Sequence, residues 1–178
     1  MTIVERKTAE TAIRVELSIG SGRAEVDTGV PFLDHMMTAL ARYGQLDLRI
    51  SATGDLRHHV IEDVALTVGD ALRRALPATC ARYGERTVPM DDALVQAVLD
   101  AGGRPYYRGP IPSALYEHWM RSFCDAARLT VHVRVLRGSD RHHIVEAAFK
   151  ALGFALRDAL VDTGSVFSTK GAVTLEGA

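Results

Sequence analysis

The feature that most constrains this chain of 178 residues is an internal repeat at an offset of 84 residues. A His-His-x-x-Glu motif begins at His58 and returns at His142, and the same small and apolar residues follow both copies. Upstream of each motif, an acidic residue precedes a histidine, at His35 and again at His118. The period is too long, and two copies are too few, for a solenoid. We therefore predict a duplicated fold with one half at residues 1–84 and the other at residues 85–178.

The two halves are predicted to contain the same elements in the same order. Strands are expected where apolar and polar residues alternate, and helices where apolar residues recur at helical spacing. In the first half these segments are strands at 2–7, 12–19 and 46–52 and helices at 31–44 and from 58 to the residues before Pro77. In the second half they are strands near 86–89, 94–99, 105–109 and 129–136 and helices from 113 and over 142–161. We expect an α+β fold of two pseudo-symmetric halves, each a small, mostly antiparallel sheet with helices packed on one face.

Composition excludes several classes of protein. Lys and Arg number 21 against 22 Asp and Glu, and no basic cluster is present to neutralise the phosphates of a nucleic acid. No apolar run approaches the ~18–20 residues that span a bilayer, and the first residues lack the apolar segment of a secretory signal. Cys80 and Cys124 have no metal-ligand spacing. We expect a cytoplasmic protein with reduced thiols that binds neither nucleic acid nor membrane.

Six of the seven histidines belong to the repeat, and His132, within a predicted strand, is assigned to structure. In each motif the glutamate follows the two histidines by four and three residues, so all three side chains share one helix face. Imidazole and carboxylate suit metals that prefer nitrogen and oxygen, whereas closed structural zinc sites use thiolates. A lone histidine is usually packed or solvated, but two copies of the motif favour metal binding. The candidate ligands, three histidines and one glutamate for each of two metals, are His35, His58, His59, Glu62, His118, His142, His143 and Glu146.

A second group of residues offers donors for an anionic substrate. Ser168, Thr169 and Lys170 supply two hydroxyls and a cation near the C-terminus, which a phosphate group needs. Arg104, between a glycine and a proline, and Arg82, in the joint between the halves, are two further candidate cations. Each signal is weak alone because most Arg and Lys side chains are solvated. Together with the predicted metal site they favour a phosphorylated substrate.

These motifs resemble those of the imidazoleglycerol-phosphate dehydratase family over nearly the whole chain. The resemblance is carried by the two HHxxE motifs and by ERKTAET from Glu5, TGVPFLDHM from Thr28, PMDDAL from Pro89, GRP from Gly103 and STKG from Ser168. It implies a hydro-lyase of histidine biosynthesis that removes water from D-erythro-imidazole-glycerol phosphate to give imidazole-acetol phosphate. It also implies two Mn²⁺ per active site and an assembly of 24 subunits, with metal ligands drawn from neighbouring chains.

The resemblance further implies a division of the candidate residues. One metal would take His58, Glu62, His118 and His142, and the other His35, His59, His143 and Glu146. Arg82, Arg104, Ser168 and Lys170 match positions that hold the substrate phosphate, and Glu10 matches an acidic residue that reaches the reaction centre. We hypothesise that Glu146 is the general base at the carbon beside the imidazole ring and that Glu10 helps to move protons to the leaving hydroxyl.

Two readings from other classes stay open. In the first, the metals are structural and join subunits of an assembly or storage module, which would bind no small phosphate ester. In the second, the same cluster serves a metal-dependent hydrolase or isomerase with another phosphorylated substrate. The chain also departs from the family pattern, because the loop at 54–57 and the stretch at 108–114 are shorter than is usual.

Overall fold

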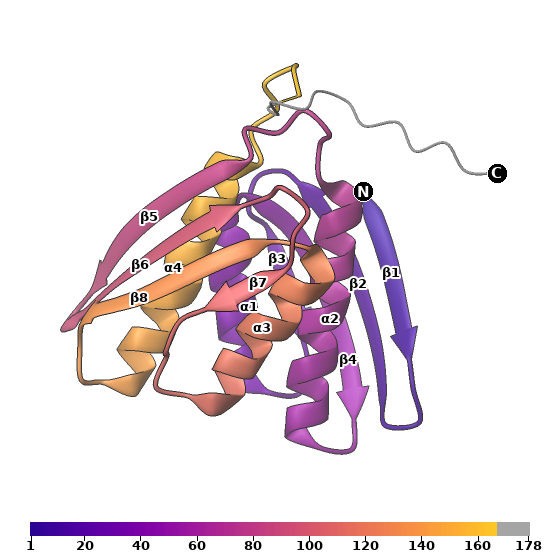
Figure 1. Cartoon of the computed structure of the whole chain (residues 1–178). Coiled ribbons are helices and arrows are strands. Elements are labelled where there is room, and N and C mark those ends of the chain that lie inside the picture. Colours follow the sequence, from indigo (N-terminus) through magenta and orange to yellow (C-terminus); the bar gives the residue numbers. More distant parts are fainter. Residues whose placement is uncertain (167–178) are drawn as a thin grey trace.

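The structure is a computed structural model that describes residues 1–166. Four helices lie between two four-stranded sheets, one sheet from each half of the chain (Figure 1). The first half comprises β1 (Thr2–Lys7), β2 (Thr11–Ile19), β3 (Ala24–Asp27), α1 (Pro31–Gly44), β4 (Leu46–Gly54) and α2 (Arg57–Ala75). The second comprises β5 (Tyr83–Met90), β6 (Ala93–Asp100), β7 (Tyr106–Arg108), α3 (Ala114–Ala127), β8 (Thr130–Arg137) and α4 (Arg141–Ala159).

The two sheets have the same topology, which confirms the predicted α+β fold of two similar halves. The strand orders are β1-β2-β4-β3 and β5-β6-β8-β7. In each sheet the first three strands are antiparallel, and the fourth runs parallel to its neighbour. The edge strand β3 was not predicted. It has only four residues, and its partly exposed Ala-Glu-Val-Asp sequence carries no apolar run long enough to indicate a strand.

Each sheet buries one face against the helices and leaves the other toward solvent. Along β2 the buried residues Ile13, Val15 and Leu17 alternate with more exposed ones, as expected for a strand covered on one side. Two of the largest fully buried side chains, Trp119 of α3 and Phe149 of α4, lie 4.7 Å apart between their ring centroids. Within the described residues, no helix is both long enough and apolar enough to span a bilayer.

The helices contact one another across the two halves, α1 against α4 and α2 against α3. The repeated glycines Gly69 and Gly153 lie at these two crossings. A Cβ atom at Gly69 would lie 2.7 Å from the carbonyl oxygen of Phe123, and one at Gly153 would lie 3.1 Å from that of Leu40. Both crossings therefore depend on close backbone approach, which brings each helix that carries a His-His-x-x-Glu motif against the upstream helix of the other half.

Candidate metal and active site

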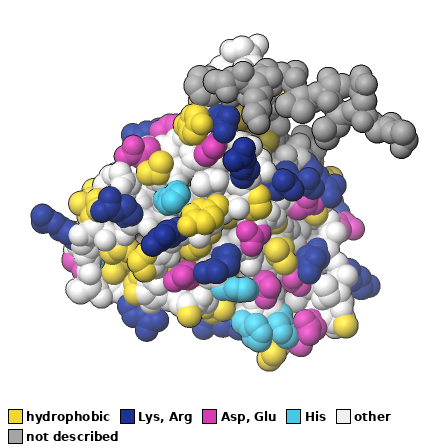
Figure 2. Space-filling view, viewed as in Figure 1, with side chains coloured by type: hydrophobic (Ala, Val, Ile, Leu, Met, Phe, Trp, Pro, Cys, Tyr) yellow, Lys and Arg dark blue, Asp and Glu magenta, His cyan; other side chains and the backbone are white. Residues whose placement is uncertain are grey.

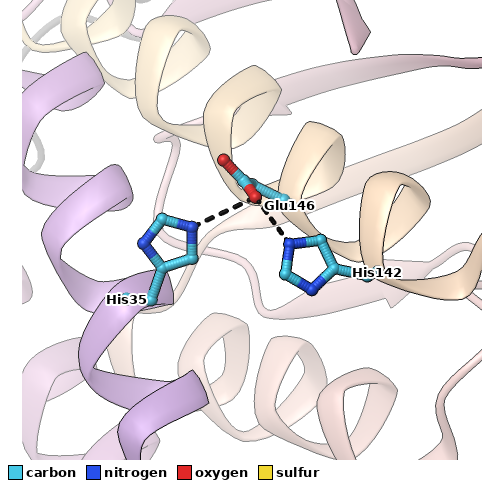
Figure 3. A group of neighbouring side chains, drawn as sticks. All are labelled: His35, His142 and Glu146. Carbon is cyan, nitrogen blue, oxygen red and sulfur yellow. Dashed lines mark hydrogen bonds and ion pairs between the residues drawn. The ribbon is translucent and has the colours of Figure 1, made fainter. Parts of the chain in front are cut away.

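The clearest group of potential ligands joins α1 and α4. The Nε2 atoms of His35 and His142 each lie 3.1 Å from Oε2 of Glu146 (Figure 3). One donor atom from each residue lies within 4.8 Å of the others, and this is the one group of three or more such residues found among residues 1–166. Asp140 caps α4 by accepting hydrogen bonds from the backbone N–H groups of His142 and His143, which fixes the start of the motif.

Glu146 is buried, and a cation that the sequence analysis did not assign stabilises its charge. Its side chain is 7% exposed, and Nζ of Lys150 donates to its Oε1 at 2.8 Å. Burial alone raises the pKa of this carboxyl, but hydrogen bonds from Lys150 and His35 outweigh burial, so the pKa lies below its ordinary value. Glu146 is therefore ionised at neutral pH. The spacing of four residues within a helix is the signal that could have identified Lys150.

A second, pseudo-equivalent pair joins α2 and α3. Nε2 of His118 lies 3.2 Å from Oε2 of Glu62, so each motif glutamate contacts the upstream histidine of the other half. The two pairs are unequal, because the Glu62 side chain is 39% exposed and Leu66 occupies the position equivalent to Lys150. On the surface, histidine side chains gather beside acidic ones over the beginning of α2 (Figure 2).

The second histidine of each motif contacts carboxylates. Nδ1 of His59 lies 2.7 Å from Oδ1 of Asp55, and Nδ1 of His143 lies 2.7 Å from Oδ1 of Asp92. These hydrogen bonds raise the pKa of both imidazoles. Glu10, in the turn between β1 and β2, places its Oε2 3.7 Å from Nδ1 of His59. No local pattern predicted a role for Asp92, which is 51 residues from its histidine.

The last predicted ligand is His58, and two of the predicted phosphate-binding residues, Arg82 and Arg104, lie within the described part of the chain. The His58 ring lies 4.1 Å from that of His59, between centroids. The Arg82 guanidinium donates to both carboxylate oxygens of Asp100, at 2.7 and 3.0 Å, which raises the pKa of Arg82. Arg104 is exposed in the loop before β7. The other predicted phosphate-binding residues lie outside the described residues; they are Ser168, Thr169 and Lys170.

Fold and site together define a class of duplicated α+β protein. In this class the four helices lie between the sheets, and a histidine of each half contacts a glutamate of the other half. The family model described as imidazoleglycerol-phosphate dehydratase matches residues 28–156. A relative of that name from Salinispora tropica is 47% identical, over 96% of this chain and 97% of its own, and one from Salinibacter ruber is also 47% identical, over 96% and 94%.

Solved structures agree with the sequence comparisons. The crystal structure of the Pyrococcus furiosus protein of this family has a TM-score of 0.86 at 43% identity and covers 96% of this chain and 100% of its own. That of the Staphylococcus aureus enzyme has a TM-score of 0.80 at 33% identity, with 91% and 99% covered. The chain belongs to the imidazoleglycerol-phosphate dehydratase family, whose members are hydro-lyases.

Proposed function

We propose that this chain catalyses the metal-dependent dehydration of D-erythro-imidazole-glycerol phosphate to imidazole-acetol phosphate in histidine biosynthesis. Family membership supports the reaction. The single observation that supports metal dependence is the group formed by His35, His142 and Glu146, whose donor atoms lie within 4.8 Å of one another. The packing of α1 against α4 brings these residues together from both halves of the chain.

The donor set fits the proposed pair of Mn²⁺ ions. Imidazole nitrogen and carboxylate oxygen suit manganese, and neither Cys80 nor Cys124 belongs to the group. When bound, the ions would supply Lewis acidity and orient the substrate. As the family resemblance implies, His58, Glu62, His118 and His142 would hold one ion, and His35, His59, His143 and Glu146 the other. The group of three found within one chain takes His142 from the first set and His35 and Glu146 from the second, so it spans both proposed sets.

The proposed roles of the chain's own residues follow from their positions. Glu146, ionised and 7% exposed, would accept the proton from the carbon beside the imidazole ring. Glu10, beside His59, would deliver a proton to the hydroxyl group, which then leaves as water. Asp100 would hold the Arg82 guanidinium for the phosphate. The other proposed phosphate-binding residues are Arg104, Ser168, Thr169 and Lys170.

We also propose that the active site is completed by neighbouring copies within a cytoplasmic assembly of 24 subunits. Within one chain the candidate ligands form a group of three and a separate pair, Glu62 with His118. His59 and His143 face aspartates at Nδ1, and neither belongs to the group of three. Two sets of four ligands would therefore require donors from another copy, which supports self-association.

The test is an assay of metal-stripped protein on imidazole-glycerol phosphate, with and without added Mn²⁺, in which light scattering follows the size of the assembly. We expect turnover to disappear with the metal and to return with Mn²⁺. Protein that has rebound metal and reassembled but does not turn over this substrate would refute the proposed reaction. Unchanged turnover in protein shown to be free of metal would refute the metal dependence.

A further inference from the structure

The second histidine of each motif has a carboxylate at Nδ1 in both halves. In each case a carboxylate oxygen lies 2.7 Å from Nδ1, from Asp55 at His59 and from Asp92 at His143. Both imidazoles are partly exposed, with side chains that are 21% accessible at His59 and 29% accessible at His143. Each ring therefore has its Nδ1 beside a carboxylate and part of its surface open to solvent.

The two carboxylates do not occupy equivalent positions of the repeat. Asp55 lies four residues before His59, in the turn between β4 and α2. The residue four before His143 is Ser139, which has no carboxylate. The second half instead receives its carboxylate from Asp92, in the turn between β5 and β6. The same contact is thus made from two different places in the fold, so duplication alone does not account for it.

We propose that Asp55 and Asp92 are positioning residues that hold the Nδ1–H group of His59 and His143, so that Nε2 of each imidazole is the metal ligand. This inference rests on the metal site of the proposed function. A neutral imidazole has one N–H group and one lone pair, and a hydrogen bond at Nδ1 fixes which nitrogen carries the proton. Such a partner also fixes the orientation of the ring and raises the basicity of the ligating nitrogen.

Both carboxylates also accept hydrogen bonds from groups other than the histidines. Oδ2 of Asp92 accepts three hydrogen bonds, from the backbone N–H of Ser139 at 2.7 Å, from its hydroxyl at 3.0 Å and from the backbone N–H of Asp140 at 3.1 Å. The other oxygen, Oδ1, is directed to His143. Oδ1 of Asp55 accepts a hydrogen bond from the backbone N–H of Leu56 at 2.6 Å, in addition to its contact with Nδ1 of His59.

Two other acidic residues near these imidazoles occupy different positions. Oδ2 of Asp91 lies 3.4 Å from Nε2 of His143, on the ligand side of the ring, and its side chain is 72% exposed. Oε2 of Glu10 lies 3.7 Å from Nδ1 of His59, a full 1 Å farther than Oδ1 of Asp55. Asp55 and Asp92 therefore make the shorter contacts at Nδ1.

The experiment is calorimetric titration of metal-stripped protein with Mn²⁺, comparing wild type with Asp55→Asn, Asp55→Glu and Asp92→Asn. Loss of an outer partner of a metal-ligating histidine typically costs about 10–100-fold in affinity, which is the weakening we expect for both Asn variants. Asp55→Glu, which keeps a carboxylate in an exposed turn, should restore most of the affinity.

Asp47 supplies a matched control. It accepts hydrogen bonds from the backbone N–H and hydroxyl of Ser21 and from the backbone N–H of Arg23, each at 3.0 Å, and so repeats the turn contacts of Asp92 with no histidine. Asp47→Asn removes the negative charge that strengthens these turn contacts, and it should keep wild-type affinity for Mn²⁺. If Asp92→Asn does not fold, Asp55→Asn decides the question, because Asp55 is exposed and its other hydrogen bond is to the adjacent Leu56.

Folded Asp55→Asn protein with wild-type Mn²⁺ affinity would overturn the inference, as would equal weakening in Asp47→Asn. Wild-type protein that binds no Mn²⁺ would overturn it together with the proposed metal dependence. Because the titration contains no substrate, a failure of the proposed reaction would appear only in the turnover assay and would leave this result unaffected.

Discussion

At the scale of single residues, Glu146 and Glu62 show how two copies of one motif acquire different properties. Both contact a histidine of the other half, but Glu146 also accepts from Lys150 and is 7% exposed, whereas Glu62 is 39% exposed. Interactions between charges are stronger away from water, so the charge of Glu146 is more firmly fixed. This difference is consistent with Glu146, and not Glu62, acting as the proposed base.

Replacing Glu146 with Gln tests that assignment. The substitution preserves the size of the side chain but removes the group proposed to accept the proton, so kcat should fall by about 10²–10⁴-fold. Metal content, measured by elemental analysis at saturating Mn²⁺, should stay largely intact because the histidines remain and the carbonyl oxygen of Gln can still act as a ligand. Glu62→Gln is the matched variant and should lower kcat less. Turnover retained in Glu146→Gln would contradict the role of Glu146 as base.

Local spacing revealed the motif residues but not their partners. His35, His142 and Glu146 could be chosen because the repeat marks them twice. Asp92 could not, since it lies 51 residues from His143 and contacts it only through the tertiary structure of the second half. Long-range contacts of this kind depend on tertiary packing, which no local pattern encodes.

At the scale of helices and strands, the crossing of α2 and α3 depends on Gly69. Replacing Gly69 with Ala would place a methyl group 2.7 Å from the carbonyl oxygen of Phe123, inside the contact distance of the two atoms. The helices must then separate, and overpacking of this kind costs about 1–3 kcal/mol in the free energy of unfolding. Urea denaturation followed by circular dichroism measures that cost.

Gly153 supplies the matched variant at the other crossing. The nearest atoms to its added Cβ would lie at 3.0–3.1 Å, a milder conflict. Gly153→Ala should therefore destabilise the protein less than Gly69→Ala. Wild-type stability in Gly69→Ala would show that the α2–α3 crossing adjusts freely.

Elements with strong periodicity were predictable, and short edge elements were not. The helices at 31–44 and from 58 onward carry apolar residues at regular helical spacing, and the structure confirms them as α1 and α2. The edge strand β3 has four partly exposed residues, and its pairing with β4 is what makes it a strand. Its counterpart β7 fell within a predicted strand at 105–109.

At the scale of the whole molecule, we propose that residues 1–84 and 85–178 unfold as one cooperative unit, because their helices contact each other across the halves. The single tryptophan, Trp119, is fully buried in the second half, where its ring packs against Phe123 and Phe149. Tryptophan fluorescence and far-ultraviolet circular dichroism should give coincident unfolding transitions. Two separate midpoints would show that the halves are independent domains.

The arrangement of the halves was the part of the fold least accessible from sequence. The repeat predicts two similar units but does not say which helix of one meets which helix of the other. That pairing follows from the buried faces of α1 and α4 and from the close approach at Gly153. The contacts of His35 with Glu146 and of His118 with Glu62 are consequences of it.

These reciprocal contacts have the symmetry of a homodimer. A half-length ancestor with one sheet, two helices and one motif would form both contacts at once by pairing with an identical copy about a two-fold axis, each glutamate reaching the other's histidine. In such an ancestor every change would appear at both sites. Fusion of two such copies into one chain would remove that restriction, and Lys150 at the position equivalent to Leu66 is a difference that is present at only one of the two sites.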